Sequence, residues 1–176
     1  ARVVCNYVAI NENVALLDLM SNLISPLGCE FIGKLMAPDM KRGIINLKLD
    51  HNPIGSEGMI KLADGLNQNK VIQNLSLQYC DIDETGARAI FEILIFQLSN
   101  LEEINLSGNR LRNDGVVEVL KGASAAKKLG KLNLQDNQFV EENFVLAAFE
   151  DCMRKNINLG CYNIKFNFIA DYGKCN

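Results

Sequence analysis

A spacing of apolar residues that recurs about every 29 residues constrains the fold of this chain more than any other feature. In the stretch LEEINLSGNRLRNDG, the positions that define it are Leu101, Ile104, Leu106, Asn109 and Leu111. The template starts again near residues 14, 44, 72, 101, 129 and 159, in steps of 30, 28, 29, 28 and 30 residues. Neither one helix nor one strand has this spacing. Six matches in register therefore indicate a solenoid of stacked units.

Each unit is expected to contain a short strand followed by a helix. The alternating pair Ile104 and Leu106 predicts a strand with one buried face. The second unit then shows an inward stripe at helical spacing, made of Met59, Leu62, Ala63 and Leu66. Because one unit leaves its apolar face uncovered, neighbouring units must share a core. We therefore predict an α/β solenoid, with a curved parallel sheet inside and helices outside.

A ladder of amide side chains is expected where each strand turns outward. The ladder positions are Asn22, Asn52, Cys80, Asn109, Asn137 and Asn167. A side-chain amide at such a bend satisfies backbone groups that the turn leaves unpaired. Six residues further on stands a small or turn-forming residue: Gly28, Gly58, Gly86, Gly115, Asn143 and Gly173. We assign these glycines to the turns.

These motifs resemble those of the leucine-rich repeat family, and the period is similar to that of its ribonuclease-inhibitor-like subclass. The resemblance covers residues 14 to 176, and residues 101–115 match one full unit of the pattern. Two positions depart from it, since Cys80 replaces a ladder Asn and Asn143 replaces a Gly. The family tolerates the first change. The resemblance implies a binding module for another protein.

The whole chain, residues 1–176, is expected to form a single array. Residues 1–13 align with the helix of a preceding unit, because Cys5 and Val8 fall opposite Ala63 and Leu66. The last unit is expected to be truncated soon after Gly173. Solenoids normally have polar terminal caps, and neither end has one. We therefore expect flanking repeats or assembly partners to cover both ends.

Alternation along each strand places three rows of side chains on the concave face. The first row is Leu16, Asn46, Asn74, Glu103, Lys131 and Cys161. The central row is Asp18, Lys48, Ser76, Asn105, Asn133 and Asn163, and the following row is Met20, Asp50, Gln78, Ser107, Gln135 and Lys165. Where each strand turns out stands an exit row, made of Ser21, His51, Tyr79, Gly108, Asp136 and Phe166. This surface is polar, rich in amides and nearly balanced in charge.

Within these rows we nominate a binding surface anchored by two adjacent exit-row residues, His51 and Tyr79, because Tyr is enriched in binding hot spots. The other candidates are Asp50, Gln78, Asn105, Asn133 and Asp136. An alternative for Tyr79 is that its ring packs over the turn of its own unit.

Composition narrows the range of partners and compartments. The net charge is −3, and the Lys and Arg residues are scattered, which argues against nucleic-acid binding. The longest apolar run falls far short of the roughly 20 residues that span a bilayer, so no membrane partner is expected. The six cysteines form no C-x-x-C pair. We expect them to be reduced, buried thiols in a reducing compartment such as the cytoplasm.

Motifs for catalysis, a metal or a cofactor are absent from the sequence. His51 is the single histidine, and no phosphate-binding loop or spaced Cys/His set occurs. A Cys–His pair with Cys80 would place the thiol in an apolar setting, which lowers its reactivity. We therefore expect no enzyme activity, no cofactor and no metal.

Three functional interpretations follow. The leading one is a non-enzymatic protein-interaction module or scaffold. The second is a structural array segment in a large cytoskeletal or ciliary assembly. The third is a GTPase-activating protein of the Ran GTPase-activating type, a class in this subclass, for which Arg110 and Arg112 lie near a strand-exit loop. Immune-receptor arrays also use this subclass, but their nucleotide-binding domain would lie outside these residues.

Overall fold

The computed structural model describes residues 1–11, 13–37, 43–67, 69–96 and 99–169. Helices and three-residue strands alternate along this part of the chain. The helices are α1 (Arg2–Ile10), α2 (Pro26–Leu35), α3 (Gly55–Leu66), α4 (Glu84–Leu94), α5 (Arg112–Ala125) and α6 (Asn143–Lys155). The strands are β1 (Leu16–Asp18), β2 (Asn46–Lys48), β3 (Asn74–Ser76), β4 (Glu103–Asn105), β5 (Lys131–Asn133) and β6 (Cys161–Asn163).

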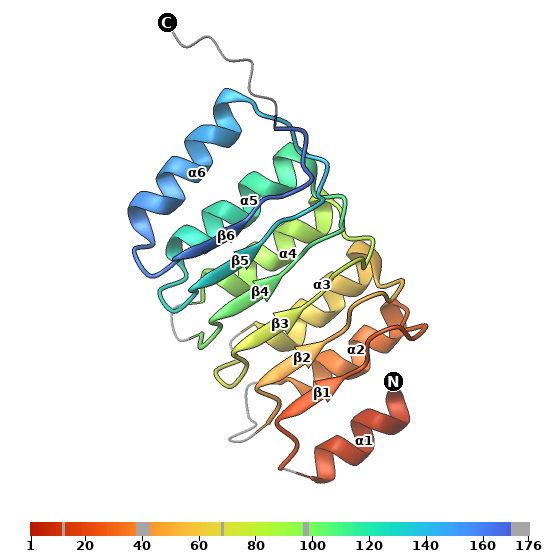
Figure 1. Cartoon of the computed structure of the whole chain (residues 1–176). Helices are drawn as coiled ribbons and strands as arrows, with labels where there is room; N and C mark the ends of the chain where they lie inside the picture. The colour runs from red at the N-terminus through yellow and green to blue at the C-terminus, as the bar shows by residue number, and fades with distance from the viewer. Residues whose placement is uncertain (12, 38–42, 68, 97–98, 170–176) are drawn as a thin grey trace, which may run out of the picture.

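The six strands form one parallel sheet in chain order, β1 to β6 (Figure 1). Their register aligns one interior column, made of Leu17, Leu47, Leu75, Ile104, Leu132 and Tyr162. The first five of these side chains are buried. The central and first rows are paired residue by residue in the same register. The interior column that the repeat predicts is therefore present.

The helices stack along one side of the sheet, and each packs against the next (Figure 1). The apolar stripe of α3 is buried between its neighbours, with Met59 and Leu62 fully inaccessible to solvent. At the N-terminal side, α1 packs on α2 and carries Cys5 into the core. The α/β solenoid expected from the sequence is confirmed.

The role assigned to the recurring glycines is wrong. Gly58 and Gly115 lie in the first turn of α3 and α5, not in the turns before them. A Cβ on Gly58 would stand 2.6 Å from Ile54 Cγ2 and 3.2 Å from the Cys29 sulfur, which belongs to the preceding helix. These glycines are therefore required for close packing between units. Gly173 lies outside the described residues.

Helix α4 has a side-chain cap at its start. The Asp83 carboxylate accepts hydrogen bonds from the N–H groups of Thr85 and Gly86, at 2.8 and 3.4 Å, and from the Ser56 hydroxyl of the preceding unit. These donors, the Ser56 hydroxyl first, lower the pKa of Asp83 below its usual 3.8.

Candidate interaction surface

Every residue of the exit row has a left-handed backbone. The φ angles are 55° at Ser21, 56° at His51, 51° at Tyr79, 70° at Gly108, 53° at Asp136 and 55° at Phe166. This conformation is uncommon for residues other than glycine, and here it recurs once in every unit. It turns the chain sharply off the sheet and points the exit-row side chains away from the core.

The backbone of the exit row is held by a hydrogen-bond ladder between units. Each N–H donates to the carbonyl of the following-row residue in the next unit. The pairs are Ser21 to Asp50, His51 to Gln78, Tyr79 to Ser107, Gly108 to Gln135 and Asp136 to Lys165, at 2.8 to 2.9 Å. The exit row is thus a rigid edge whose side chains are free to differ.

The rings of His51 and Tyr79 are stacked. Their centroids are 4.9 Å apart and the ring planes differ by 8°. On its other side, the Tyr79 ring covers Gly108, where an added Cβ would stand 2.2 Å from Tyr79 Cε1. Tyr79 therefore packs between the neighbouring units rather than on its own turn. We call these three residues the aromatic stack.

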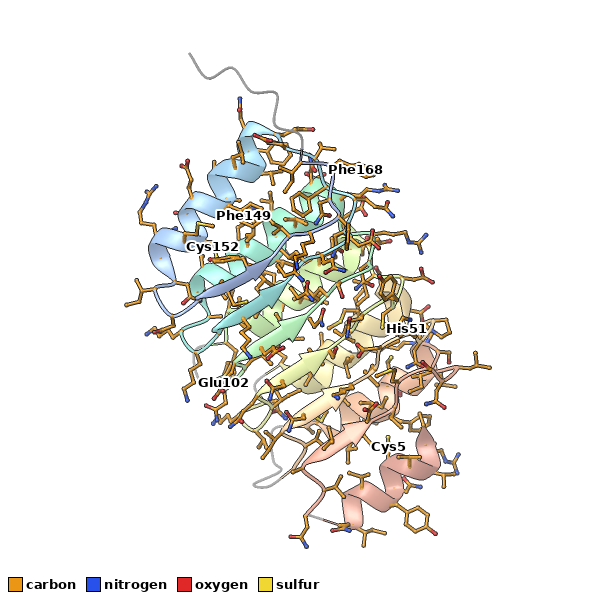
Figure 2. The ribbon with its side chains drawn as sticks, in the orientation of Figure 1. Cys5, His51, Glu102, Phe149, Cys152 and Phe168 are labelled. Atoms are coloured by element: carbon orange, nitrogen blue, oxygen red, sulfur yellow. The ribbon has the colours of Figure 1, made fainter. Side chains whose placement is uncertain are left out.

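The aromatic stack remains open to solvent at its outer edge. Tyr79 is 44% exposed, and His51 is exposed as well. Figure 2 places His51 and Phe168 along one edge of the molecule, with Glu102 at the opposite edge. A fixed, amphipathic aromatic side chain at an exposed edge is the kind of group that anchors protein interfaces.

Asp50 does not have the accessible position that we expected of a binding residue. It is only 2% exposed, and its carboxylate is bound by Ser76 and Gln78 of the next unit. The physical reason is that Ser76 and Gln78 of the next unit lie against its carboxylate and donate hydrogen bonds to it. Asp50 therefore holds neighbouring units of the surface together rather than contacting a partner directly.

Asn105 and Asn133 are partly buried and use one amide atom within their own units. The Asn105 Oδ1 accepts the N–H of Ser107 at 3.1 Å, and the Asn133 Oδ1 accepts that of Gln135 at 3.0 Å. Asp136 in the exit row is also partly buried. Of the seven nominated residues, His51 and Tyr79 are thus the pair that the structure brings together at the surface.

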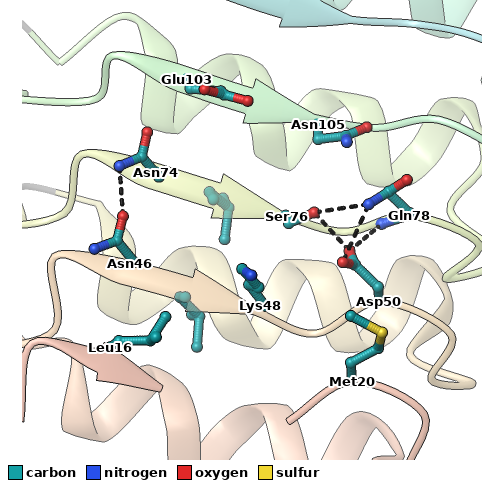
Figure 3. Close-up of a pocket in the computed structure, with 12 residues that line it drawn as sticks. Leu16, Met20, Asn46, Lys48, Asp50, Asn74, Ser76, Gln78, Glu103 and Asn105 are labelled. Atoms are coloured by element: carbon teal, nitrogen blue, oxygen red, sulfur yellow. Dashed lines mark hydrogen bonds between the residues drawn. The ribbon is translucent and has the colours of Figure 1, made fainter. Parts of the chain in front are cut away.

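The concave face next to the aromatic stack is hollowed over the first four strands (Figure 3). The hollow has a volume of about 540 Å³ and includes both apolar and polar walls. The exposed side chains of Leu16 and Met20 form one wall, and amides such as Asn74 form the other, with Asn74 donating to Asn46. The hollow can therefore receive a side chain with an apolar stem and a polar end.

Charges along this face are largely neutralised by neighbours. Lys48 pairs with Asp18 at 3.7 Å, and Lys131 pairs with Glu103 at 3.2 Å. All four side chains are well exposed, so each pair contributes little to stability. The face offers hydrogen bonds rather than a strong electrostatic field.

The ladder positions carry hydrogen bonds from unit to unit. Asn109 illustrates the pattern: its Nδ2 donates to the carbonyls of Leu106 and Leu77, both at 2.8 Å. Its Oδ1 accepts the N–H groups of Cys80 and Ile82 at 3.1 and 3.0 Å. Corresponding side-chain bonds into the preceding unit occur at Asn52, Cys80, Asn137 and Asn167. Asn22 is exposed and bonds within its own unit.

A second amide ladder, at the opposite corner of the units, was missed by the sequence analysis. Asn156 donates to the carbonyls of Ala123 and Ala126 at 2.8 Å, and Asn69 donates to that of Met36 at 2.7 Å. Both are buried. Both stand three residues before a unit start, and that offset was the available signal.

Cys80 is a buried structural thiol. Its sulfur donates to the carbonyl of Leu49, and burial raises its pKa to about 12. A protonated thiol of this kind is a poor nucleophile, so Cys80 and His51 do not form a reactive pair. Among the described cysteines, five thiols are free, and Cys161 alone of these is exposed; Cys175 lies outside the described residues.

Within the described ranges, no three His, Cys, Asp or Glu side chains are grouped so as to hold a metal ion. In the same part of the chain, every helix falls short of the length and apolar character that crossing a membrane requires.

Comparison with known families identifies the class. A family model described as "Leucine Rich repeat" matches residues 46–63, 68–91 and 97–120. The tropomodulin C-terminal domain from Caenorhabditis elegans has a similar fold, with a TM-score of 0.66, 19% identity and coverage of 80% of this chain and 83% of that domain. Residues 46–120 thus contain leucine-rich repeats, and the described chain has the fold of a leucine-rich repeat solenoid.

Sequence relatives specify the kind of repeat. Ribonuclease inhibitor from Mus musculus is 32% identical over 81 residues, which make up 46% of this chain and 18% of the relative. Protein NLRC5 from Mus musculus is 38% identical over 99 residues, 54% of this chain and 5% of the relative. The chain thus spans a small part of the length of these proteins. Its repeats are of the ribonuclease-inhibitor-like kind, a class of protein-interaction module.

Proposed function

We propose that this chain is a non-enzymatic binding module that holds another protein through the aromatic stack and the adjoining concave hollow. The observation that carries the proposal is the stacked pair of His51 and Tyr79, exposed on a backbone that is fixed between units. Hot spots of protein interfaces favour such anchored aromatic residues.

A quantitative capture experiment tests this surface. The protein is immobilised, exposed to a cell extract, and compared with the double variant His51→Ala/Tyr79→Ala. The captured amount of a specific partner should fall by about 30-fold, the ratio that corresponds to a hot spot of roughly 2 kcal/mol. Phe144→Ala supplies the control, because Phe144 is an exposed aromatic residue in the first turn of α6.

The circular dichroism spectrum and melting temperature of the double variant should match those of the unmodified chain, because neither ring belongs to the core. Equal recovery of every captured protein by the double variant would contradict the choice of surface. Selective loss with Phe144→Ala would instead place the interface near α6.

A structural array segment in a cytoskeletal or ciliary assembly remains the second proposal. In that case the outer helices make the contacts. Crosslinks from a native assembly should then fall on the helical face, for example at Lys61 and Lys121, and spare Lys48 on the concave face. The opposite distribution would favour the leading proposal.

The GTPase-activating interpretation requires an available arginine. Arg110 lies 3.2 Å from Asp81, and Arg112 lies 3.6 Å from Glu84, so both guanidinium groups have an acidic partner in the preceding unit. Both arginines are more than half exposed, so these pairs can break at small cost. A GTP-hydrolysis assay with a panel of small GTPases decides this alternative.

We also propose that the module works in a reducing compartment such as the cytoplasm. Support comes from Cys29 and Cys80, whose sulfur atoms are packed in the core as small hydrophobic groups. Alkylation of cells lysed directly into urea, which exposes these thiols, should trap them in the reduced form.

A further inference from the structure

A network of side chains joins the second, third and fourth units next to the aromatic stack. Figure 3 shows its part among Asp50, Ser76 and Gln78. The Asp50 Oδ1 accepts hydrogen bonds from the Ser76 hydroxyl and from the N–H of Gln78, both at 2.7 Å. The Asp50 Oδ2 accepts from the Gln78 Nε2 at 3.2 Å. The Gln78 Oε1 in turn accepts from the Ser107 hydroxyl at 3.0 Å. Asp50, Gln78 and Ser107 each directly precede a residue of the aromatic stack.

Among the residues that the structure describes, a bond from the N–H of a following-row residue to a side chain of the preceding unit occurs at this one place. In the second unit the central-row residue is Lys48, whose side chain cannot accept a hydrogen bond. In the first, fourth, fifth and sixth units the N–H of the following-row residue is accepted by the central-row side chain of its own unit. Those pairs are Met20 with Asp18, Ser107 with Asn105, Gln135 with Asn133 and Lys165 with Asn163, at 3.0 to 3.3 Å. In the third unit the central-row residue is Ser76, and the N–H of Gln78 bonds to Asp50 of the second unit instead.

As a result, both backbone groups of Gln78 are held by the second unit. Its N–H donates to Asp50, and its carbonyl accepts the N–H of His51 at 2.8 Å. The chain entering Tyr79 is thereby fixed relative to the chain at His51. Because Asp50 is only 2% exposed, its hydrogen bonds are shielded from competition with water.

We propose that Asp50, acting through Gln78, is the positioning residue of the aromatic stack, so that the pre-formed part of the interaction surface is confined to the second, third and fourth units. The inference rests on the proposed function, because it specifies where on the exit row the partner is held. Groups held in their bound geometry beforehand lose less entropy on binding.

Proton NMR of the free protein tests this positioning directly. His51 is the single histidine, so its two carbon-bound ring protons give isolated signals. Because the imidazole lies parallel to the Tyr79 ring at 4.9 Å, the ring current of Tyr79 shifts these signals upfield. Tyr79→Ala removes the ring and supplies the unstacked reference.

Asp50→Asn is the main variant, since it keeps the size of the side chain and removes the charge and one acceptor oxygen. Most of the upfield shift of the His51 protons should disappear in this variant. Asp18→Asn is the matched control, because Asp18 accepts its hydrogen bond with one carboxylate oxygen, which the amide oxygen replaces, whereas Asp50 accepts with both. The control should retain the full shift.

A second variant covers the case in which Asp50→Asn fails to fold. Gln78→Ala removes the side-chain bonds to Asp50, Ser76 and Ser107 and leaves the backbone ladder in place, and it should also lose most of the shift. Retention of the full shift in a folded Asp50→Asn or Gln78→Ala protein would overturn the proposal. The readout needs no partner, so failure of the proposed function would appear separately, as unchanged capture by His51→Ala/Tyr79→Ala.

Discussion

Gly65 of α3 lies directly against Gly33 of α2. A Cβ built on Gly65 would stand 1.8 Å from the carbonyl oxygen of Gly33 and 2.6 Å from its Cα. Both glycines are buried within their helices. The two backbones thus approach each other more closely than any larger residue at this position allows.

Gly65→Ala should therefore lower the free energy of unfolding by about 2 to 3 kcal/mol, because the methyl group meets backbone atoms that have no room to move. Urea denaturation followed by circular dichroism measures this change. Gly130→Ala is the control: the atoms nearest its Cβ are at 3.7 Å, so stability should change by less than about 1 kcal/mol. Similar losses for both variants would show that the helix contact is not the cause.

Asn109→Ala should destabilise the array by about 3 kcal/mol or more. The replacement leaves the N–H groups of Cys80 and Ile82 and the carbonyl of Leu77 without their side-chain partner, and each buried unsatisfied group costs about 1 to 3 kcal/mol. Asn22→Ala should cost well under half as much, because Asn22 is exposed and bonds within its own loop. Equal midpoints of urea unfolding for Asn109→Ala and Asn22→Ala would contradict the larger stabilising role of Asn109.

Asp83→Ala should lower stability by about 1 kcal/mol at neutral pH through loss of the α4 cap. Folding depresses the pKa of Asp83 below its usual 3.8. The stabilisation is therefore present above that value and is lost as the pH falls through the depressed pKa. Thermal melts of the two proteins should thus converge in acid. Glu142→Ala is the comparison, since Glu142 at the start of α6 makes no side-chain cap bond. A difference in melting temperature between the unmodified chain and Asp83→Ala that does not change with pH would contradict the role of Asp83 as a charged cap.

The buried thiols should differ sharply from the exposed one in reactivity. Burial raises the pKa of Cys29 and of Cys80 to about 12, so native Cys29 and Cys80 should react with iodoacetamide at least about tenfold more slowly than Cys161. Site-resolved mass spectrometry measures the three rates, and urea should remove the difference.

The same thiols make the fold sensitive to alkali. Their folded-state pKa lies above the usual value of 9.0, so the folded state retains these protons longer than the unfolded state does. Stability is complete below about pH 9 and declines as the pH rises toward 12. Melting temperatures that stay constant over this interval would contradict the burial of these groups.

The fold could be predicted because its determinants are local and repeated. Leu47, Leu75 and Ile104 each stand three residues after a unit start. Because side chains alternate along a strand, the apolar residues determine which face of the strand packs on the core. The alignment of the interior column then follows from stacking like units. Gly58 was misassigned because the sequence shows only its offset, whereas its role depends on Cys29 in another helix.

The candidate site could be predicted only in part. The neighbouring positions of His51 and Tyr79 follow from the period, but their stacking depends on side-chain orientation and on the space left at Gly108. The carboxylate of Asp50 is bonded to Ser76, which stands where most other units have an acidic or amide residue. The replacement of a bond within a unit by a bond to the preceding unit leaves no periodic signal in a single sequence.

In the exit row, the atoms that connect neighbouring units differ from the atoms that are available to contact a partner. Its amide groups connect neighbouring units, as His51 does with Gln78 and Tyr79 with Ser107, while the side chains take no part in that connection. A new specificity can therefore arise by exchanging side chains along this edge, without rebuilding the scaffold that presents them. Gly108 is the exception, because a larger residue there would displace the ring of Tyr79.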